Sequence, residues 1–194
     1  MLVRLFFLSL VIAVLPAQAD TVAIIGTGSV ASALGPEFAA QGHTIIYGSR
    51  SPERDEIQDL IANTGDSASA TTPGEAVKNA DIVVLAVPGM LVEEITLGLG
   101  NLAGKVIIDP TNPLLEGGDG LIHGVATSNA EIIQAAAPGA FVVKAFNTLS
   151  WRTMTEPESS GGPVSIPLSG DSDDAKATVA ALVEGMGLEA IDVG

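Results

Sequence analysis

The 194-residue sequence has no cysteine, only two histidines and only eight basic residues. Without cysteine there is no disulfide, no thiolate nucleophile and no cysteine-ligated zinc or iron–sulfur site. Two histidines, His43 and His123, are too few for a histidine-rich metal site, so we predict no resident metal. Eight Lys and Arg against 23 Asp and Glu give a formal net charge of −15. This charge argues against a nucleic-acid partner, because phosphate binding needs a basic surface.

The chain is nevertheless rich enough in apolar residues to fold. Hydrophobic residues make up 47% of the sequence and charged residues 16%. This composition can bury a full core and is unlike that of a disordered chain. The length is typical of one domain.

The N-terminal segment differs in character from the rest of the chain. Arg4 is followed by a mostly apolar run of eleven residues and then by an A-x-A pattern that ends at Ala19. This pattern is typical of a secretory signal peptide, and the run is too short for a membrane-spanning helix, which needs roughly 20 residues. We predict a signal peptide at 1–19, a domain at 20–194, no stable membrane span after cleavage, and a periplasmic or secreted protein. The alternative is an uncleaved short anchor or a mis-assigned start codon, and if the signal-peptide prediction is wrong we expect a cytoplasmic protein.

Apolar, strand-like runs alternate with helix-like segments beyond the predicted cleavage site. The expected strands are 21–25, 43–47, 82–87, 106–108, 141–143, 164–168 and 188–193. The expected helices cover 29–41, 128–137 and 173–186, with two more starting at Ser51 and Thr72, and loops are expected at 116–124 and 156–163. The alternation predicts an α/β fold, a doubly wound parallel sheet of Rossmann type in a single domain.

Three of the expected helices begin with a capping motif. Ser51 is followed by proline, a favoured first helical residue. Thr72 with Glu75, and Ser128 with Glu131, have the spacing of a capping box. These motifs set the expected helix starts.

A glycine motif, G-x-G-x-x-A at 26–31, lies between the first strand and the first helix. Gly26 permits a tight turn, Gly28 lets the backbone approach a pyrophosphate, and Ala31 is small enough for close packing of the helix on the strand. The helix N-terminus offers free N–H groups and a positive dipole end to phosphates. In this context the motif predicts a dinucleotide site.

The end of the second strand indicates which dinucleotide is bound. NAD sites place an acidic residue there to accept from the ribose 2′-hydroxyl, whereas this sequence has Ser49 and Arg50. Arg50 offers a planar donor fork for a 2′-phosphate, and Arg54 supplies a second charge. We therefore predict NADP, the alternative being that both arginines are solvated and pair with the acidic residues next to them.

Six segments, in order, resemble the NADP oxidoreductases of the coenzyme F420-dependent type. They are GTGSVASALG, YGSR, AVP, DPTNPL, KAFNT and SGDSDDAKATVAALVEGMGLEAIDVG. The same fold unit occurs in pyrroline-5-carboxylate reductases and in the oxidoreductase domain of STEAP metalloreductases. The resemblance covers essentially 20–194.

The glycine motif and this resemblance together imply a set of site residues. They are Gly26, Thr27, Gly28, Ser29 and Val30 at the phosphates, Ser49, Arg50 and Arg54 at the 2′-phosphate, Val87, Pro88 and Gly89 at the nicotinamide end, and Leu114, Asn147 and Trp151 at the acceptor pocket. Lys144 and Arg152 are the cations near KAFNT that could serve an anionic acceptor.

The expected activity is hydride transfer between NADPH and a flavin-like small molecule such as coenzyme F420 or a flavin. Hydride transfer needs two rings held in contact rather than an acid–base pair, so no catalytic residue is assigned. A homodimer is also expected. The alternatives are a non-catalytic dinucleotide-binding module and an NADPH-dependent imine or ferric reductase on the same fold.

Overall fold

The computed structural model describes residues 19–115, 120–122 and 126–194. The predicted signal peptide therefore lies almost wholly outside the described residues, as does most of the predicted loop at 116–124. No helix among the described residues is both long enough and apolar enough to cross a membrane.

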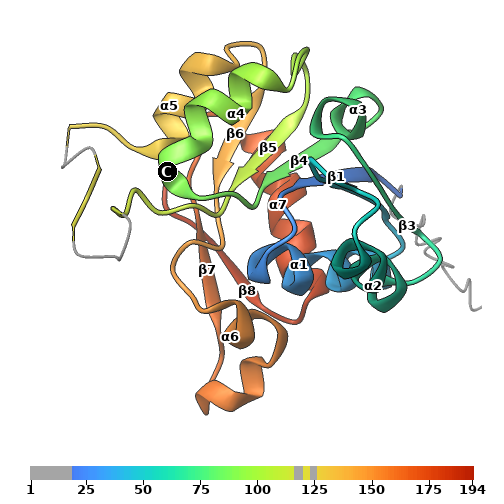
Figure 1. Ribbon diagram of the computed structural model, residues 1–194. Helices are drawn as coiled ribbons and strands as arrows, with labels where there is room; N and C mark the ends of the chain where they lie inside the picture. Colours follow the sequence, from blue (N-terminus) through green and yellow to red (C-terminus); the bar gives the residue numbers. More distant parts are fainter. Residues whose placement is uncertain (1–18, 116–119, 123–125) are drawn as a thin grey trace, which may run out of the picture.

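Six parallel strands form the main sheet, in the order β3-β2-β1-β4-β5-β6 (Figure 1). Their bounds are β1 (Thr21–Ile25), β2 (Thr44–Gly48), β3 (Ala68–Thr71), β4 (Ile82–Leu85), β5 (Val106–Asp109) and β6 (Phe141–Lys144). This is the strand order of the Rossmann fold, so the predicted doubly wound α/β architecture is confirmed. The strand β3 was not predicted, because its sequence, ASAT, is small and polar rather than apolar.

Helices cover both faces of this sheet. They are α1 (Ser29–Ala40), α2 (Asp55–Thr64), α3 (Pro73–Lys78), α4 (Val92–Gly98), α5 (Asn129–Ala136), α6 (Trp151–Thr155) and α7 (Asp173–Gly185), with 3-10 turns η1 (Gly89–Leu91) and η2 (Pro157–Ser160). Val22 and Ile24 of β1 pack in one core with α1 and α7. Ala23 and Ile25 pack in a second core with α3, α4 and α5. Burial on both faces explains why the central strands are continuous apolar runs.

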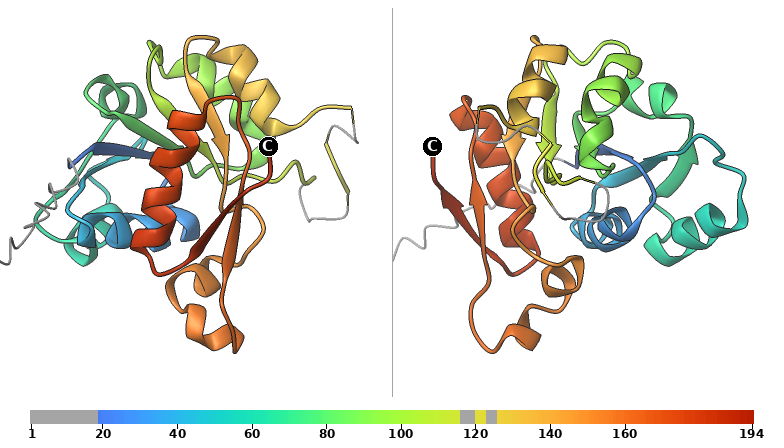
Figure 2. Two further views of the ribbon diagram at one scale, coloured as in Figure 1. Left: turned by 180° about the vertical axis from the view of Figure 1, so that it is seen from behind. Right: turned by 60° about the vertical axis from the view of Figure 1, so that its left-hand side comes forward.

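The last two strands do not join the main sheet. β7 (Ser165–Leu168) and β8 (Glu189–Asp192) pair with each other in parallel and form a separate two-stranded sheet. An isolated antiparallel bridge joins Lys144, at the end of the edge strand β6, to Ser169, the residue that follows β7. In Figures 1 and 2, β7 and β8 run side by side from the α6 end of the molecule toward the C-terminus, apart from the main sheet. The expectation of one parallel sheet is therefore wrong for the last two strands, although their positions are correct.

Of the three predicted capping motifs, only the one at Ser128 forms as expected. Ser128 and Glu131 form the full capping box, and the hydrogen bonds from Ser128 lower the pKa of Glu131. Thr72 is the N-cap of α3 but makes no side-chain cap. The helix expected at Ser51 begins at Asp55 instead, because the chain first makes a turn in which Arg54 N–H donates to the Ser51 carbonyl at 3.3 Å. The short helix α6, just before the predicted 156–163 loop, was not predicted.

Candidate functional site

The loops that follow β1, β2, β4, β5 and β6 all emerge at the carboxyl edge of the parallel sheet. The chain order reverses between β1 and β4, which are neighbours in the sheet. In open α/β sheets the ligand crevice lies outside the carboxyl ends of the strands at such a reversal. The predicted phosphate, 2′-phosphate and nicotinamide residues lie in these loops.

The two glycines of the motif have different structural roles. Gly26 has a φ of +101°, its N–H donates to the Gly48 carbonyl at 3.1 Å, and a Cβ here would lie 2.2 Å from the Ala86 carbonyl oxygen. Only glycine fits this turn. A Cβ on Gly28, in contrast, would meet nothing within 4 Å. The space above Gly28 is open, as a pyrophosphate cradle requires.

The first turn of α1 is free of competing side-chain groups. Gly28 is the N-cap and no acidic residue occupies the first turn. Ser29 is exposed and Val30 half-buried, whereas Ala31 is fully buried against the sheet. A helix N-terminus of this kind presents unpaired N–H groups and a positive dipole end, which suits a phosphate group.

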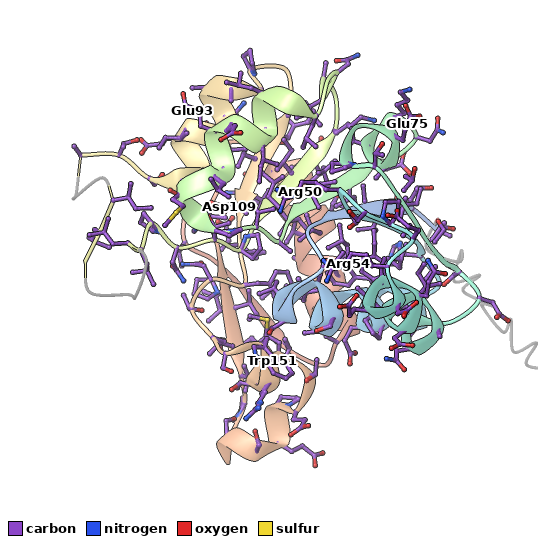
Figure 3. All side chains as sticks on the ribbon, viewed as in Figure 1. Arg50, Arg54, Glu75, Glu93, Asp109 and Trp151 are labelled. Atoms are coloured by element: carbon purple, nitrogen blue, oxygen red, sulfur yellow. The ribbon has the colours of Figure 1, made fainter. Side chains whose placement is uncertain are left out.

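Arg50 and Arg54 differ in their surroundings. Both side chains are exposed. Arg54 Nη2 lies 2.9 Å from Glu56 Oε1, so the alternative of pairing with a neighbouring acid holds for Arg54. No ion pair of the described residues includes Arg50, which lies near the carboxyl edge of the sheet in Figure 3. Ser49, between β2 and Arg50, accepts a hydrogen bond from the Ser51 N–H at 3.2 Å.

The loop after β4 is pressed against the loop after β5. A Cβ on Gly89 would lie 2.0 Å from the Asn112 carbonyl oxygen and 2.8 Å from Asn129 Nδ2. Val87 is half-buried and Pro88 exposed just before this contact. Glycine at this position lets the predicted nicotinamide loop approach the next loop closely.

A buried polar network joins the loops after β4, β5 and β6. Asp109 is fully buried, and its Oδ2 accepts from Lys144 Nζ at 2.9 Å. Its Oδ1 accepts from the N–H and hydroxyl of Thr111 at 2.9 and 2.7 Å. Asn129 Nδ2 donates to Thr111 Oγ1 at 2.7 Å and to the Gly89 carbonyl at 3.2 Å. Lys144 also donates to the Thr111 carbonyl. Its ammonium group therefore binds partners within the protein and is not free to bind an anionic electron acceptor.

Two asparagines hold together the loops after β5 and β6. Asn112 Nδ2 donates to the Asn147 carbonyl at 2.9 Å, and Asn147 Nδ2 donates to Asn112 Oδ1 at 3.3 Å. The preceding residue, Phe146, has a left-handed φ of 64°, is buried, and packs edge-to-face on Phe38 at 6.2 Å between ring centroids. A left-handed φ is uncommon for a bulky residue, so the buried ring fixes the turn that carries Asn147.

Comparison with known proteins adds to this geometry. Residues 21–113, which contain the glycine motif and the strands β1 to β5 of the main sheet, match the family described as NADP oxidoreductase, coenzyme F420-dependent. The first half of the chain is thus similar to this NADP oxidoreductase family. A candidate F420-dependent NADP reductase from Arthrobacter sp. FB24 has a solved structure that superposes with a TM-score of 0.83 at 29% identity, covering 91% of this chain and 85% of that one.

Two curated relatives extend the similarity beyond residue 113. The F420-dependent NADP reductase of Methanothermobacter thermautotrophicus is 29% identical over 189 residues, 87% of this chain and 78% of that protein. The metalloreductase STEAP3 of Rattus norvegicus is 32% identical over 184 residues, 94% of this chain. The chain spans only 36% of the length of STEAP3.

The residues predicted at the acceptor pocket are less closely assembled than those predicted at the nucleotide. Leu114 is 44% exposed and forms an antiparallel bridge with Leu121. Trp151 is 38% exposed on α6, with Arg152 at 5.0 Å from its ring centroid. In Figure 3, Trp151 lies apart from Arg50 and Asp109. The assignment of Leu114, Asn147 and Trp151 to one pocket remains a prediction.

Sequence reasoning missed the central part of the network, Asp109, Thr111 and Asn129. The available signal was the DPTN segment directly after an apolar strand, where a polar group stands at the carboxyl edge of the sheet. Asn129 was expected only as a helix residue after the Ser128 cap. Among the residues that the structure describes, no group of three or more His, Asp or Glu side chains is arranged to hold a metal ion.

Proposed function

We propose that this protein is an NADP oxidoreductase that binds NADPH in preference to NADH and transfers a hydride to a flavin-like acceptor, such as coenzyme F420 or a flavin. The proposed preference for NADPH rests on the two residues that follow β2. Ser49 and the exposed Arg50 stand where an NAD site has a carboxylate, and no described ion pair includes Arg50. A guanidinium is suited to bidentate contact with a phosphate.

The nucleotide would be held by backbone on one side and by charge on the other. Gly28 leaves open space over the N-terminus of α1, which suits the pyrophosphate. Arg50 would bind the 2′-phosphate, and Arg54 would join it by exchanging its contact with Glu56. That exchange costs little, since exposed ion pairs are worth only about 0–1 kcal/mol.

The remaining loops would position the reacting rings. NADPH, when bound, supplies the hydride from its nicotinamide ring. The buried network from Gly89 through Asn129 and Thr111 to Asp109 fixes the loop predicted to line that ring. Rigid placement of this kind is what a hydride transfer requires. No residue of the site is assigned an acid–base role.

The acceptor class rests on the relatives. The Methanothermobacter relative is an F420-dependent NADP reductase, which supports coenzyme F420 as the acceptor. The likeness to STEAP3, a metalloreductase, favours a ferric chelate as the second candidate. A non-catalytic nucleotide-binding role is the third.

A single assay separates these acceptors. Purified protein is mixed with NADPH and with F420, FMN or a ferric chelate, and the absorbance of the reduced nicotinamide is followed. Oxidation of NADPH only with F420 or FMN supports the proposal, and oxidation only with the chelate supports the second candidate. NADPH binding without oxidation by any acceptor would identify a non-catalytic module. Gly28→Val serves as the binding-deficient control.

We also propose that the chain is exported and cleaved after Ala19. The N-terminal sequence pattern supports this, as does the start of the fold, because Thr21 already pairs with Thr44 of β2. The sheet therefore begins directly after the proposed cleavage point. An exported protein would acquire NADPH outside the cytoplasm.

A further inference from the structure

A row of ionisable residues lies at the amino edge of the main sheet, opposite the nucleotide site. His43, Asp20, Asp81 and Lys105 each immediately precede a strand, namely β2, β1, β4 and β5. These four strands are neighbours in the order β2-β1-β4-β5. The row therefore runs from imidazole through two carboxylates to ammonium, with the two carboxylates side by side in the middle.

The backbone N–H of Asp20 donates a hydrogen bond to His43, the first residue of this row. It lies 3.1 Å from Nδ1 of His43, whose residue is only 9% exposed. The Asp20 carbonyl accepts from the Thr44 N–H at 3.0 Å, and the next N–H, of Thr21, donates to Asp81 Oδ2 at 2.9 Å. The backbone around Asp20 is thus hydrogen-bonded to residues at the starts of both neighbouring strands, β2 and β4.

The two carboxylates lack a full cation among residues 19–115, 120–122 and 126–194. His43 Nδ1 lies 3.7 Å from Asp20 Oδ2, but this nitrogen accepts the N–H of Asp20 and so carries no proton of its own. No ion pair of these described residues includes Asp81. Lys105 Nζ donates to the Ala80 carbonyl at 2.6 Å. Burial raises the pKa of the Asp20 carboxyl; His43 opposes this rise and Asp81 adds to it. A positive charge beside Asp20 would stabilise its carboxylate against this burial and against the neighbouring Asp81.

We propose that the α-amino group of a chain cleaved between Ala19 and Asp20 is a structural cation, which binds among His43 Nδ1 and the carboxylates of Asp20 and Asp81 and locks β1 to its neighbours. This inference rests on the proposed export. In the cleavage, a signal-peptidase-type protease adds water across the peptide bond. Ala19 keeps the carboxylate, and the nitrogen of Asp20 becomes an amine that takes a proton. The N–H that donates to His43 is then replaced by an ammonium with three donors in the same place.

The first test compares two chains, one beginning at Asp20 and one beginning at Ala17, each released from a fusion by a protease that leaves no extra residue. Both contain every described strand and helix. At pH 7 the Asp20 chain is expected to unfold at a temperature about 2–4 °C higher. Equal midpoints, or a lower midpoint for the Asp20 chain, would overturn the proposal.

Variants locate the effect. We call the difference in unfolding temperature between the Asp20 chain and the Ala17 chain the gain. In Asp81→Asn this gain should fall by at least half, because the amide can still accept from the Thr21 N–H but carries no charge. Asp59→Asn, an exposed carboxylate on α2, should leave the gain unchanged. A gain that survives Asp81→Asn, or that is lost equally in Asp59→Asn, would contradict the assigned site.

The dependence of the gain on pH gives a signature that packing alone would not produce. The α-amine has an unfolded pKa of about 7.7–8.0, and the carboxylates of Asp20 and Asp81 should raise it in the folded chain. The gain is then complete below the unfolded value and lost as the pH rises through the folded one. The ionisable side chains beside the amine in this row are those of His43, Asp20, Asp81 and Lys105. A gain that is flat from pH 6 to 10 would contradict the proposal.

Mass spectrometry of the protein from its native host separates this inference from the export proposal. An N-terminus at Asp20 supports both. An N-terminus at Met1 would overturn the processing step, whereas the thermal comparison would still report whether an amine at Asp20 binds in the row.

Discussion

Lys144 and Asp109 form an ion pair across the carboxyl ends of β5 and β6, where they are register partners. The Nζ–Oδ2 distance is 2.9 Å, with Asp109 fully buried and the Lys144 side chain 21% exposed. The pair fixes the loop after β5, through Thr111 and Asn129, against the loop after β4. The proposed nicotinamide end of the site is thereby coupled to the stability of the sheet edge.

Asp109→Asn is expected to lower the free energy of unfolding by about 3 kcal/mol, since it leaves Lys144 without its counter-charge in a mostly buried position. Urea unfolding measures this. Glu75→Gln removes the exposed pair with Lys78 and should cost less than about 1 kcal/mol. Similar losses in the two variants would mean that the buried pair has no special role.

Arg50→Ala is expected to weaken NADPH binding by about 1.5–3 kcal/mol, roughly tenfold or more, through loss of a charge-assisted contact to the 2′-phosphate. NADH binding should be unchanged. Arg54→Ala should have a smaller effect, because Arg54 first has to leave Glu56. Titration of both nucleotides against the three proteins provides the measurement, and equal affinity of the unmodified protein for NADPH and NADH would rule out the NADP preference.

Gly28 and Gly26 are expected to respond oppositely to substitution. Gly28→Val should abolish nucleotide binding while leaving the fold intact, because its side chain would enter open space. Gly26→Ala should destabilise the fold by about 1–3 kcal/mol, given the positive φ and the approach to Ala86. Circular dichroism and a binding titration on the same samples decide the matter. Undiminished binding by Gly28→Val would reduce the motif to a turn.

The tether between α7 and β8 should depend on pH. Lys176 Nζ donates to Asp192 Oδ1 at 3.0 Å, and the hydrogen bond from Lys176 lowers the pKa of Asp192. A lowered carboxyl pKa contributes stability above the unfolded value, about 3.9, which is lost as the pH falls through the folded value. Asp192→Asn should therefore lower the melting temperature at pH 7, and its difference from the unmodified chain should disappear in strong acid.

Asp66→Asn, which changes an exposed carboxylate far along the chain from this tether, is the matched control. It should show little difference at either pH. A deficit of Asp192→Asn that persists unchanged in strong acid would show that the tether acts through packing rather than charge.

Local sequence was enough to determine the parts of this protein that depend on neighbouring residues. The glycine motif requires a tight turn and an open approach within six residues, and both are present at Gly26 and Gly28. The capping box of Ser128 and Glu131 closes within one helical turn. The apolar runs of β1 and β4 are continuous because both faces of each strand are covered. These features led from sequence to the Rossmann fold and to its proposed nucleotide site.

Only the tertiary structure decided which distant residues meet. Asp109 and Lys144 are separated by 35 positions, and nothing local marks them as partners until β5 and β6 align. The turn at Ser51, which delays α2, and the division of β7 and β8 from the main sheet likewise depend on hydrogen bonds and packing that form between elements. Sequence patterns report each element's own preference, whereas pairings across the fold are set by the geometry in which all elements bury their apolar faces together.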